Sequence, residues 1–262
     1  MSKLIIWGRS DSSNVQKVLW CCKELKLNFE RIDLGGGFGG NKEKDYLKLN
    51  PNGLVPTLQD GEFTLWESNS ILRYLVEQYG HDSTLAPFSL KNRAYANQWM
   101  DWQLSAMSPT MGPLFLQLTR TPLAQQNASI IEKHLAETIR LWEIVDRYLE
   151  SSSYLAGNDF SIADIPLGIW AYRWFNLPSN LLPIMGNLSR WYQDLCQRPA
   201  YQECIMGSSI QSESSEKMSY SLPSISTNPI SYFSSPVNSA AHEAKMAPQF
   251  GPQRDFIREN KK

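Results

Sequence analysis

The sequence predicts an α+β domain at residues 1–80 and an all-α domain at residues 91–206, joined by a linker at 81–90. Short apolar runs and helical repeats alternate in the first stretch, whereas all the apolar repeats of the second have the helical period. A hydrophobic content of 42% in 262 residues is enough for a full core. The serine-rich stretch 207–262 cannot bury enough apolar surface, and we predict that it is disordered.

The predicted order of elements in the first domain is strand, helix, strand, short helix, strand, strand, helix, which is the order of a thioredoxin-like domain. The expected strands are 3–7, 29–34, 56–59 and 63–66, and the expected long helices are 14–27 and 68–79. Asp60-Gly61 between the last two strands predicts a two-residue hairpin. The glycine-rich run 35–40 lacks the GxGxxG spacing, so we predict a flexible loop there and no phosphate site.

The second domain is predicted to be a helical bundle. Its expected helices are 92–118, 124–149, 161–176, 188–197 and 199–206. Ser161 and Asp164 have the spacing of a capping box, with Asp in place of the usual Glu or Gln, and Phe160 can pack onto Ile165. Loss of such a cap costs about 1 kcal/mol, so this motif is a folding signal.

The charge excludes some partners. A formal net charge of −1 gives no electrostatic reason to expect a nucleic acid or an anionic membrane surface. No stretch approaches the roughly 18–20 apolar residues that span a bilayer, so no membrane association is expected and a cytoplasmic location is the expectation.

The cysteines and histidines predict no metal site. The four cysteines are Cys21, Cys22, Cys196 and Cys204, and their spacing fits neither a CxxC motif nor zinc. We predict buried or partly buried structural thiols in a reducing compartment. The histidines, His81, His134 and His242, are scattered and are expected to have no catalytic or metal-binding role.

The turn before the first helix is where reactive groups lie in a thioredoxin-like domain, because the helix N-terminus offers free N–H groups and a partial positive charge. Ser12, Ser13 and Asn14 occupy it in place of CxxC, which excludes dithiol exchange. A hydroxyl there can still stabilise the thiolate of a bound thiol. A shift of about two pKa units needs roughly 2.7 kcal/mol, which a charge-assisted hydrogen bond of about 1.5–3 kcal/mol and a dipole of about 0.3–1 kcal/mol supply. The alternative is that these residues only cap the helix.

Two further segments predict a pocket for a small peptide. The loop Asn50–Pro56 has the character of a segment that exposes backbone hydrogen-bonding groups beside a cis-proline. Glu67-Ser68 ends a strand with a carboxylate and begins a helix with a hydroxyl. Together they suit a ligand with both an amine and a carboxylate. A plain helix cap is the alternative for Glu67-Ser68.

These motifs together resemble the cytosolic glutathione transferases, and most closely the bacterial serine-type members. The resemblance covers about residues 1–206, and it lies in Ser12-x-Asn14-x-x-Lys17-Val18, the Asn50–Pro56 loop, Glu67-Ser68 and the Ser161/Asp164 box. A single motif of this kind is weak, but four in register are specific. The resemblance implies glutathione as co-substrate, no metal, and a homodimer.

The family's glutathione contacts transfer to matching positions of this chain. The resemblance implies that the Ser12 hydroxyl stabilises the thiolate and that Asn14 is a second polar contact or alternate donor. It implies that Val55, after Leu54, pairs its backbone with the cysteinyl part, beside a cis Pro56.

The same resemblance places the γ-glutamyl end of glutathione on the first turn of a helix. Glu67 would bind the amine, and Ser68 the carboxylate. Many relatives carry a basic or imidazole group where Gly53 or Leu54 stands, so the contact to the glycyl carboxylate is open; Lys42, Lys44 and Arg9 are candidates.

The resemblance also implies a small hydrophobic electrophile, bound between the domains against the first long helix of the bundle. The side chains available for it are Trp102, Met107, Met111, Phe115 and Tyr172, with Trp99 and Phe175 nearby. Aromatic and methionine side chains at helical spacing also suit a core, so some of these belong there.

The expected function is an enzyme that joins glutathione to an electrophilic carbon or displaces halide from one, by thiolate stabilisation and proximity. A glutathione-dependent peroxidase or disulfide reductase is an alternative within enzymes. A non-catalytic scaffold or regulatory binding protein is the alternative from another class, and the serine-rich tail is the feature that favours it.

Overall fold

The computed structural model describes residues 3–87 and 89–207. The prediction of disorder concerns a segment that, beyond Gly207, lies outside the described residues.

The first part of the chain forms a four-stranded sheet with the strand order β2-β1-β3-β4. Strand β1 (Leu4–Trp7) pairs in parallel with β2 (Phe29–Ile32) and antiparallel with β3 (Thr57–Asp60). Strand β3 pairs antiparallel with β4 (Phe63–Trp66), which forms one edge of the sheet. The four predicted strands are present, each within two residues of its predicted bounds.

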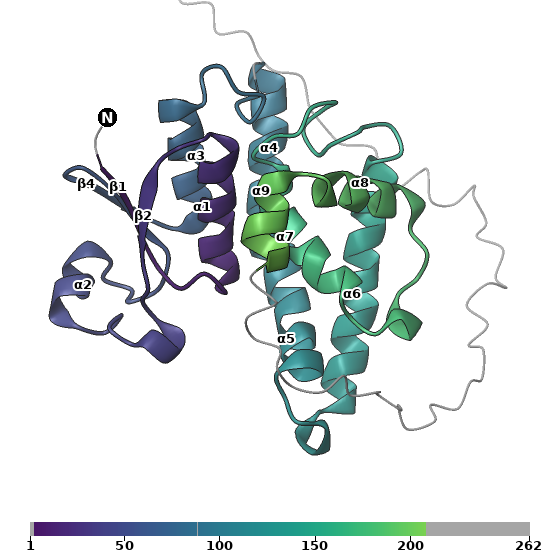
Figure 1. Cartoon of the computed structure of the whole chain (residues 1–262). Helices are drawn as coiled ribbons and strands as arrows, with labels where there is room; N and C mark the ends of the chain where they lie inside the picture. Colours follow the sequence, from purple (N-terminus) through teal and green to yellow (C-terminus); the bar gives the residue numbers. More distant parts are fainter. Residues whose placement is uncertain (1–2, 88, 208–262) are drawn as a thin grey trace, which may run out of the picture. The chain divides into compact units, whose positions relative to one another are not determined.

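The described residues of this part also form three α-helices, α1 (Ser13–Glu24), α2 (Lys44–Leu49) and α3 (Ser68–Tyr79). A short 3-10 helix, Gly36–Phe38, lies in the glycine-rich run that was predicted to be a flexible loop. Helices α1 and α3 lie side by side (Figure 1). Their apolar faces are buried, as the 3.6-residue period of the sequence predicts. The chain therefore has the predicted thioredoxin-like domain, and the parallel β1–β2 pair is connected by α1.

The β3–β4 hairpin differs by one residue from the prediction. Asp60 pairs with Phe63, so the two loop residues are Gly61 and Glu62 in place of Asp60 and Gly61. The carboxylate of Asp60 accepts hydrogen bonds from the hydroxyl groups of Tyr74, at 2.7 Å, and Tyr79. These bonds hold Asp60 at the end of the strand, and Gly61 adopts φ +60°, which favours glycine.

The second part of the described chain is helical, as predicted. Its α-helices are α4 (Leu90–Trp102), α5 (Ser108–Thr119), α6 (Ala128–Tyr148), α7 (Asp164–Phe175), α8 (Gly186–Cys196) and α9 (Pro199–Tyr201), the last followed by a π-helical turn at Gln202–Met206.

The first helix of this part is interrupted, contrary to the single helix predicted at 92–118. A π-helical turn, Gln103–Met107, separates α4 from α5. The N–H of Ser108 bonds to the carbonyl of Gln103, five residues back, and Pro109 next to it has no N–H for an α-helical bond. Such turns often occur at functional sites.

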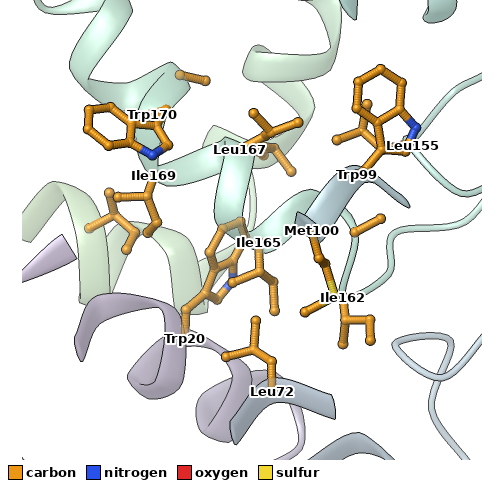
Figure 2. Packing of buried hydrophobic residues seen from close by; sticks show 14 of the residues in the cluster. Trp20, Leu72, Trp99, Met100, Leu155, Ile162, Ile165, Leu167, Ile169 and Trp170 are labelled. Carbon is orange, nitrogen blue, oxygen red and sulfur yellow. The ribbon is translucent and has the colours of Figure 1, made fainter. Parts of the chain in front are cut away.

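Buried side chains of both parts form one hydrophobic core. Trp20 of α1 has no exposed surface and lies in the same cluster as Leu72 of α3 and Ile165 of α7 (Figure 2). The ring of Trp20 lies 4.7 Å from that of Tyr201 and 5.4 Å from that of Phe160. The four cysteines are free; Cys196 is half-buried and the other three are buried, as predicted.

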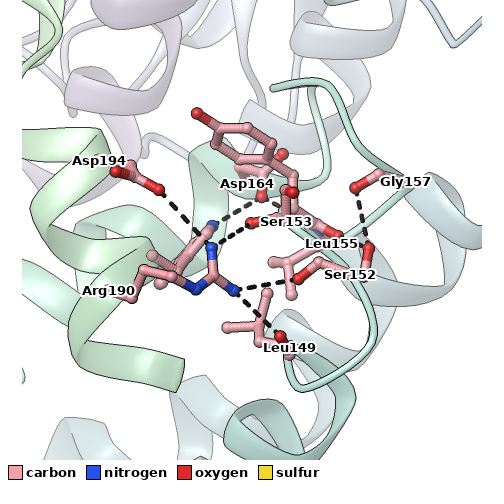
Figure 3. Close-up of polar contacts among 10 residues, drawn as sticks. Leu149, Ser152, Ser153, Leu155, Gly157, Asp164, Arg190 and Asp194 are labelled. Atoms are coloured by element: carbon pink, nitrogen blue, oxygen red, sulfur yellow. Dashed lines mark hydrogen bonds and ion pairs between the residues drawn. The ribbon is translucent and has the colours of Figure 1, made fainter. Parts of the chain in front are cut away.

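The predicted pair Ser161 and Asp164 is hydrogen-bonded at the start of α7, and Figure 3 shows Asp164 beside Leu155. The carboxylate of Asp164 accepts hydrogen bonds at 3.0 Å from the N–H groups of Ser161 and Leu155, and at 2.9 Å from the indole N–H of Trp191. The Ser161 hydroxyl in turn accepts from the N–H of Ala163, at 3.2 Å. Burial raises the pKa of Asp164 to about 6, and these hydrogen bonds oppose that rise.

Replacing Asp164 with Ala should lower the free energy of unfolding by about 3 kcal/mol, because it leaves several buried donors without an acceptor. The matched change Ser161→Ala removes only part of the box and should cost about 1 kcal/mol. Urea unfolding of both variants at pH 7.5 measures the two values. If both variants lose the same free energy of unfolding, the Asp164 carboxylate is not the main acceptor of this box.

Candidate functional site

Two of the predicted segments meet at Gly8, where β1 leads into the turn before α1. A Cβ atom on Gly8 would lie 2.4 Å from Cγ2 of Val15 and 3.1 Å from Cβ of Val55. Gly8 also has φ +150°. Only glycine therefore allows the Asn50–Pro56 loop to approach the first turn of α1 this closely.

The Asn50–Pro56 loop has the predicted cis peptide bond between Val55 and Pro56. The carbonyl of Leu54 accepts hydrogen bonds from the Asn50 side chain, at 2.9 Å, and from the Tyr46 hydroxyl, at 2.6 Å. In contrast, the backbone N–H and C=O of Val55 have no hydrogen-bond partner within 3–87 and 89–207. These two groups are free for a ligand.

The third segment, Glu67-Ser68, joins the other two at the N-terminus of α3. The Ser68 hydroxyl donates a hydrogen bond to Oδ1 of Asn14, at 3.3 Å, and so links the first turns of α3 and α1. Glu67 is exposed, has φ +74°, and makes no side-chain capping bond to α3. Positive φ at a non-glycine residue is costly and is concentrated at functional sites, so a simple capping role does not describe Glu67.

Ser12 is the N-cap residue of α1, but its side chain makes no capping hydrogen bond. Its carbonyl accepts the first helical bond, from Gln16 N–H at 2.8 Å. The half-buried hydroxyl has no hydrogen-bond partner in the described part of the chain. The structure thus leaves this oxygen available beside the positive end of α1. Asn14 is exposed, and its side chain accepts from Ser68.

Lys17 is a member of this site to which the sequence analysis gave no role, although it belongs to the motif Ser12-x-Asn14-x-x-Lys17-Val18. Only 1% of the residue is exposed. Its ammonium group donates hydrogen bonds to Gln103 Oε1 at 2.9 Å, Asn69 Oδ1 at 3.2 Å and Ser68 Oγ at 3.3 Å. It therefore ties α1 to the start of α3 and to the π-helical turn. A further signal in the sequence is that this lysine lies amid the apolar positions Val15 and Val18.

The ammonium group of Lys17 is bonded to neutral oxygen atoms only. Burial lowers the pKa of Lys17 to about 7, the charge of Glu67 raises it, and that of Arg173 lowers it further. A cation buried without a bonded carboxylate is unfavourable. An anion bound at Ser68 would favour the charged form of this lysine.

The five residues predicted to contact an electrophile separate into two groups. Met107 and Met111 have no exposed surface and pack in the core, so neither side chain is open to an electrophile. Trp102, Phe115 and Tyr172 are half-buried. The ring of Trp102 lies 5.3 Å from that of Trp99, and the ring of Phe115 lies 4.5 Å from the guanidinium of Arg173.

Comparisons with known proteins agree with this architecture. The glutathione S-transferase N-terminal domain matches residues 2–77, and the glutathione S-transferase C-terminal domain matches 96–199. The glutathione S-transferase GstB of Escherichia coli is 39% identical over 205 residues, which are 78% of this chain and 98% of GstB. The chain belongs to the glutathione S-transferase family.

This glutathione S-transferase is also similar to a solved structure and to a second relative. A theta-class glutathione S-transferase from Xanthomonas axonopodis pv. citri, with glutathione bound, is 43% identical and has a TM-score of 0.74, covering 79% of this chain and 98% of that one. The disulfide-bond oxidoreductase YfcG of Escherichia coli is 28% identical, over 78% of this chain and 95% of YfcG.

Residues 3–87 and 89–207 of this glutathione S-transferase contain neither a candidate metal site nor a membrane-spanning helix. No three histidine, cysteine, aspartate or glutamate side chains there are grouped so that they could hold a metal ion. The helices found there are all too short or too polar to cross a membrane.

Lys17 should make the stability of the protein depend on pH. Its folded pKa of about 7 lies below the ordinary 10.5, so between these values the unfolded chain binds the extra proton. Stability therefore rises with pH across this window, by up to about 1.4 kcal/mol per pH unit. Urea unfolding at pH 7.5 and 9.5 measures this effect. Between these pH values, the free energy of unfolding of the wild type should rise by about 2–3 kcal/mol relative to that of Lys17→Met.

Lys48, which is exposed and paired with Asp45, provides the control variant Lys48→Met for this measurement. If the free energies of unfolding of the wild type and Lys17→Met differ by the same amount at both pH values, Lys17 does not have the lowered pKa of a buried lysine.

Proposed function

We propose that the chain is a serine-type glutathione S-transferase that binds glutathione and uses its thiolate to attack an electrophilic carbon. The observation that carries the proposal is the unbonded Ser12 hydroxyl at the N-terminus of α1, beside the free backbone groups of Val55. A thiol held there gains a charge-assisted hydrogen bond and the field of the helix terminus, both of which favour its ionised form.

The neighbouring groups suit the remainder of glutathione. The N–H and C=O of Val55 can pair with the cysteinyl backbone, next to the exposed Leu54. Glu67 can bind the γ-glutamyl amine, and Ser68 its carboxylate, at the first turn of α3. Asn14 then loses its bond from Ser68 and becomes available to the ligand.

The reaction needs no group beyond those of the site and the substrates. The thiol loses its proton to solvent on ionisation. Its sulfur attacks an electrophilic carbon, a C–S bond forms, and in a substitution a halide leaves with the electron pair of the broken bond. Ser12 lowers the cost of the thiolate, and binding of both reactants supplies proximity. Trp102, Phe115 and Tyr172 are the side chains proposed to contact an apolar electrophile.

The proposal includes a cytoplasmic homodimer. Phe63 and Trp66 on the edge strand β4 are 45% and 37% exposed. Exposed aromatic side chains on a sheet edge favour burial against a second copy.

A glutathione-dependent disulfide reductase is the second candidate, and the likeness to YfcG favours it. It would use the same thiolate, with the sulfur of a disulfide as the group attacked. A comparison of turnover on a glutathione mixed disulfide and on an aryl halide separates the two activities.

The Ser12→Ala variant tests the proposal. The wild type should be retained on immobilised glutathione and should hold the bound thiol with a pKa about two units below its free value. Ser12→Ala should raise that pKa by about one to two units and lower turnover near pH 6.5 by about 10- to 100-fold. The absorbance of the thiolate, titrated against pH, measures the first value.

The neighbouring half-buried hydroxyl provides the matched control, Ser13→Ala, which should change neither value. Retention with an unshifted thiol would favour the non-catalytic scaffold. If the protein is not retained on glutathione, both the transferase and the glutathione-binding scaffold are rejected.

A further inference from the structure

Arg173, near the end of α7, carries a charge that the described residues do not neutralise. The residue is half-buried, and its guanidinium lies 4.5 Å from the centre of the Phe115 ring and 5.1 Å from that of the Trp170 ring. It makes neither a hydrogen bond nor an ion pair with any residue in 3–87 or 89–207. A partly desolvated arginine is normally bonded to a carboxylate or to carbonyl groups.

Other cations are close enough to oppose the charge of Arg173. Burial lowers the pKa of Arg173 to about 10, and Arg120 and Arg9 lower it further, while Asp11 raises it. The charge of Arg173 also lowers the pKa of Lys17. The charges of Arg9 and Arg120 therefore act on Arg173, and the charge of Arg173 acts on Lys17.

Arg9 adds a second unpartnered group to this region. Its Nε atom is buried and has no hydrogen-bond partner in the described part of the chain. The side chain passes over Gly36, where a Cβ atom would lie 2.4 Å from Nε. Asp11 accepts one hydrogen bond from Arg9, at 3.2 Å, but it is 51% exposed. One exposed carboxylate does not balance the guanidinium groups of both Arg9 and Arg173.

The region borders the place proposed for the sulfur. Arg9 lies three positions before Ser12 in the same turn. Phe115, which packs against Arg173, is one of the side chains proposed to contact the electrophile. The glutathione contacts lie between residues 8 and 69, whereas Arg173 and Arg120 belong to the helical part. Because Arg173 packs on Phe115, its charge lies next to a side chain proposed to contact the second substrate.

We propose that Arg173, assisted by Arg9, binds a carboxylate on the second substrate, which is an aryl or alkyl electrophile with an anionic end. The inference rests on the proposed function. Contact with two aromatic rings holds the guanidinium without using its N–H groups, which remain available for paired hydrogen bonds with a carboxylate. The apolar body of such a substrate lies against Phe115.

Two fluoroarenes with the same leaving group test the charge preference. 4-Fluoro-3-nitrobenzoate and 4-fluoro-3-nitrobenzamide differ in the charge of one substituent. In both, the glutathione sulfur bonds to the fluorine-bearing carbon, the C–F bond breaks, and fluoride leaves with the electron pair. Division of each kcat/KM by the uncatalysed rate constant removes the difference in intrinsic reactivity.

The wild type should favour the benzoate by about 10- to 100-fold on this normalised scale. Arg173→Gln should abolish that preference while it leaves the benzamide rate and the KM for glutathione within about twofold of the wild type. Arg173→Lys should keep part of the preference, because it retains the charge and loses the paired geometry. Arg140→Gln, on the exposed face of α6, is the control and should keep all of it.

Several results would overturn the inference. An equal loss on both substrates would assign Arg173 to packing. A raised KM for glutathione with unchanged selectivity would assign it to the glycyl carboxylate. Benzamide turnover without a benzoate preference in the wild type would reject this inference and leave the proposed function standing. Failure to turn over either arene, with no retention on glutathione, would reject both.

Discussion

The buried ammonium group of Lys17 is the interaction on which the geometry of the site depends. It bonds to Ser68 and Asn69 at the start of α3 and to Gln103 in the π-helical turn, so it fixes α1 against elements from both parts of the chain. Ser68 in turn bonds to Asn14, one turn before Lys17. A charge held by neutral oxygen atoms can still be stabilised by an anion, and the proposed position of the γ-glutamyl carboxylate, at Ser68, is one bond away.

The local signals of the sequence predicted most of the fold. Apolar periods located the helices and strands, and the spacing of Ser161 and Asp164 located the capping box. The hairpin was predicted one residue early, because the sequence does not reveal that Tyr74 and Tyr79 hold Asp60 in the strand. The π-helical turn was missed because hydrophobic period alone does not detect one extra residue in a long helix.

The site could also be predicted in part, because some of its residues lie in short local motifs and others do not. Ser12, Val55 and Ser68 belong to short motifs whose chemistry is local. The partners of Lys17 are 51, 52 and 86 positions away, so only the folded chain brings them together. Met107 in the π-helical turn and Met111 in α5 have the same helical spacing as ligand-contacting residues, and sequence alone does not distinguish the buried face of this segment from its open one.

The net charge of −1 conceals a local excess of positive charge around the turn before α1. Lys17 lies beside the proposed γ-glutamyl contact, and Arg9 and Arg173 lie toward the proposed second substrate. With the N-terminus of α1, these groups favour anions at three neighbouring positions: a carboxylate, a thiolate, and the anionic end of the electrophile.

A crystal structure of the protein with glutathione tests the central claim most directly. The account predicts the sulfur within about 3.5 Å of the Ser12 hydroxyl oxygen and the cysteinyl backbone paired with Val55. A sulfur turned away from Ser12, with glutathione held elsewhere on the chain, would contradict it.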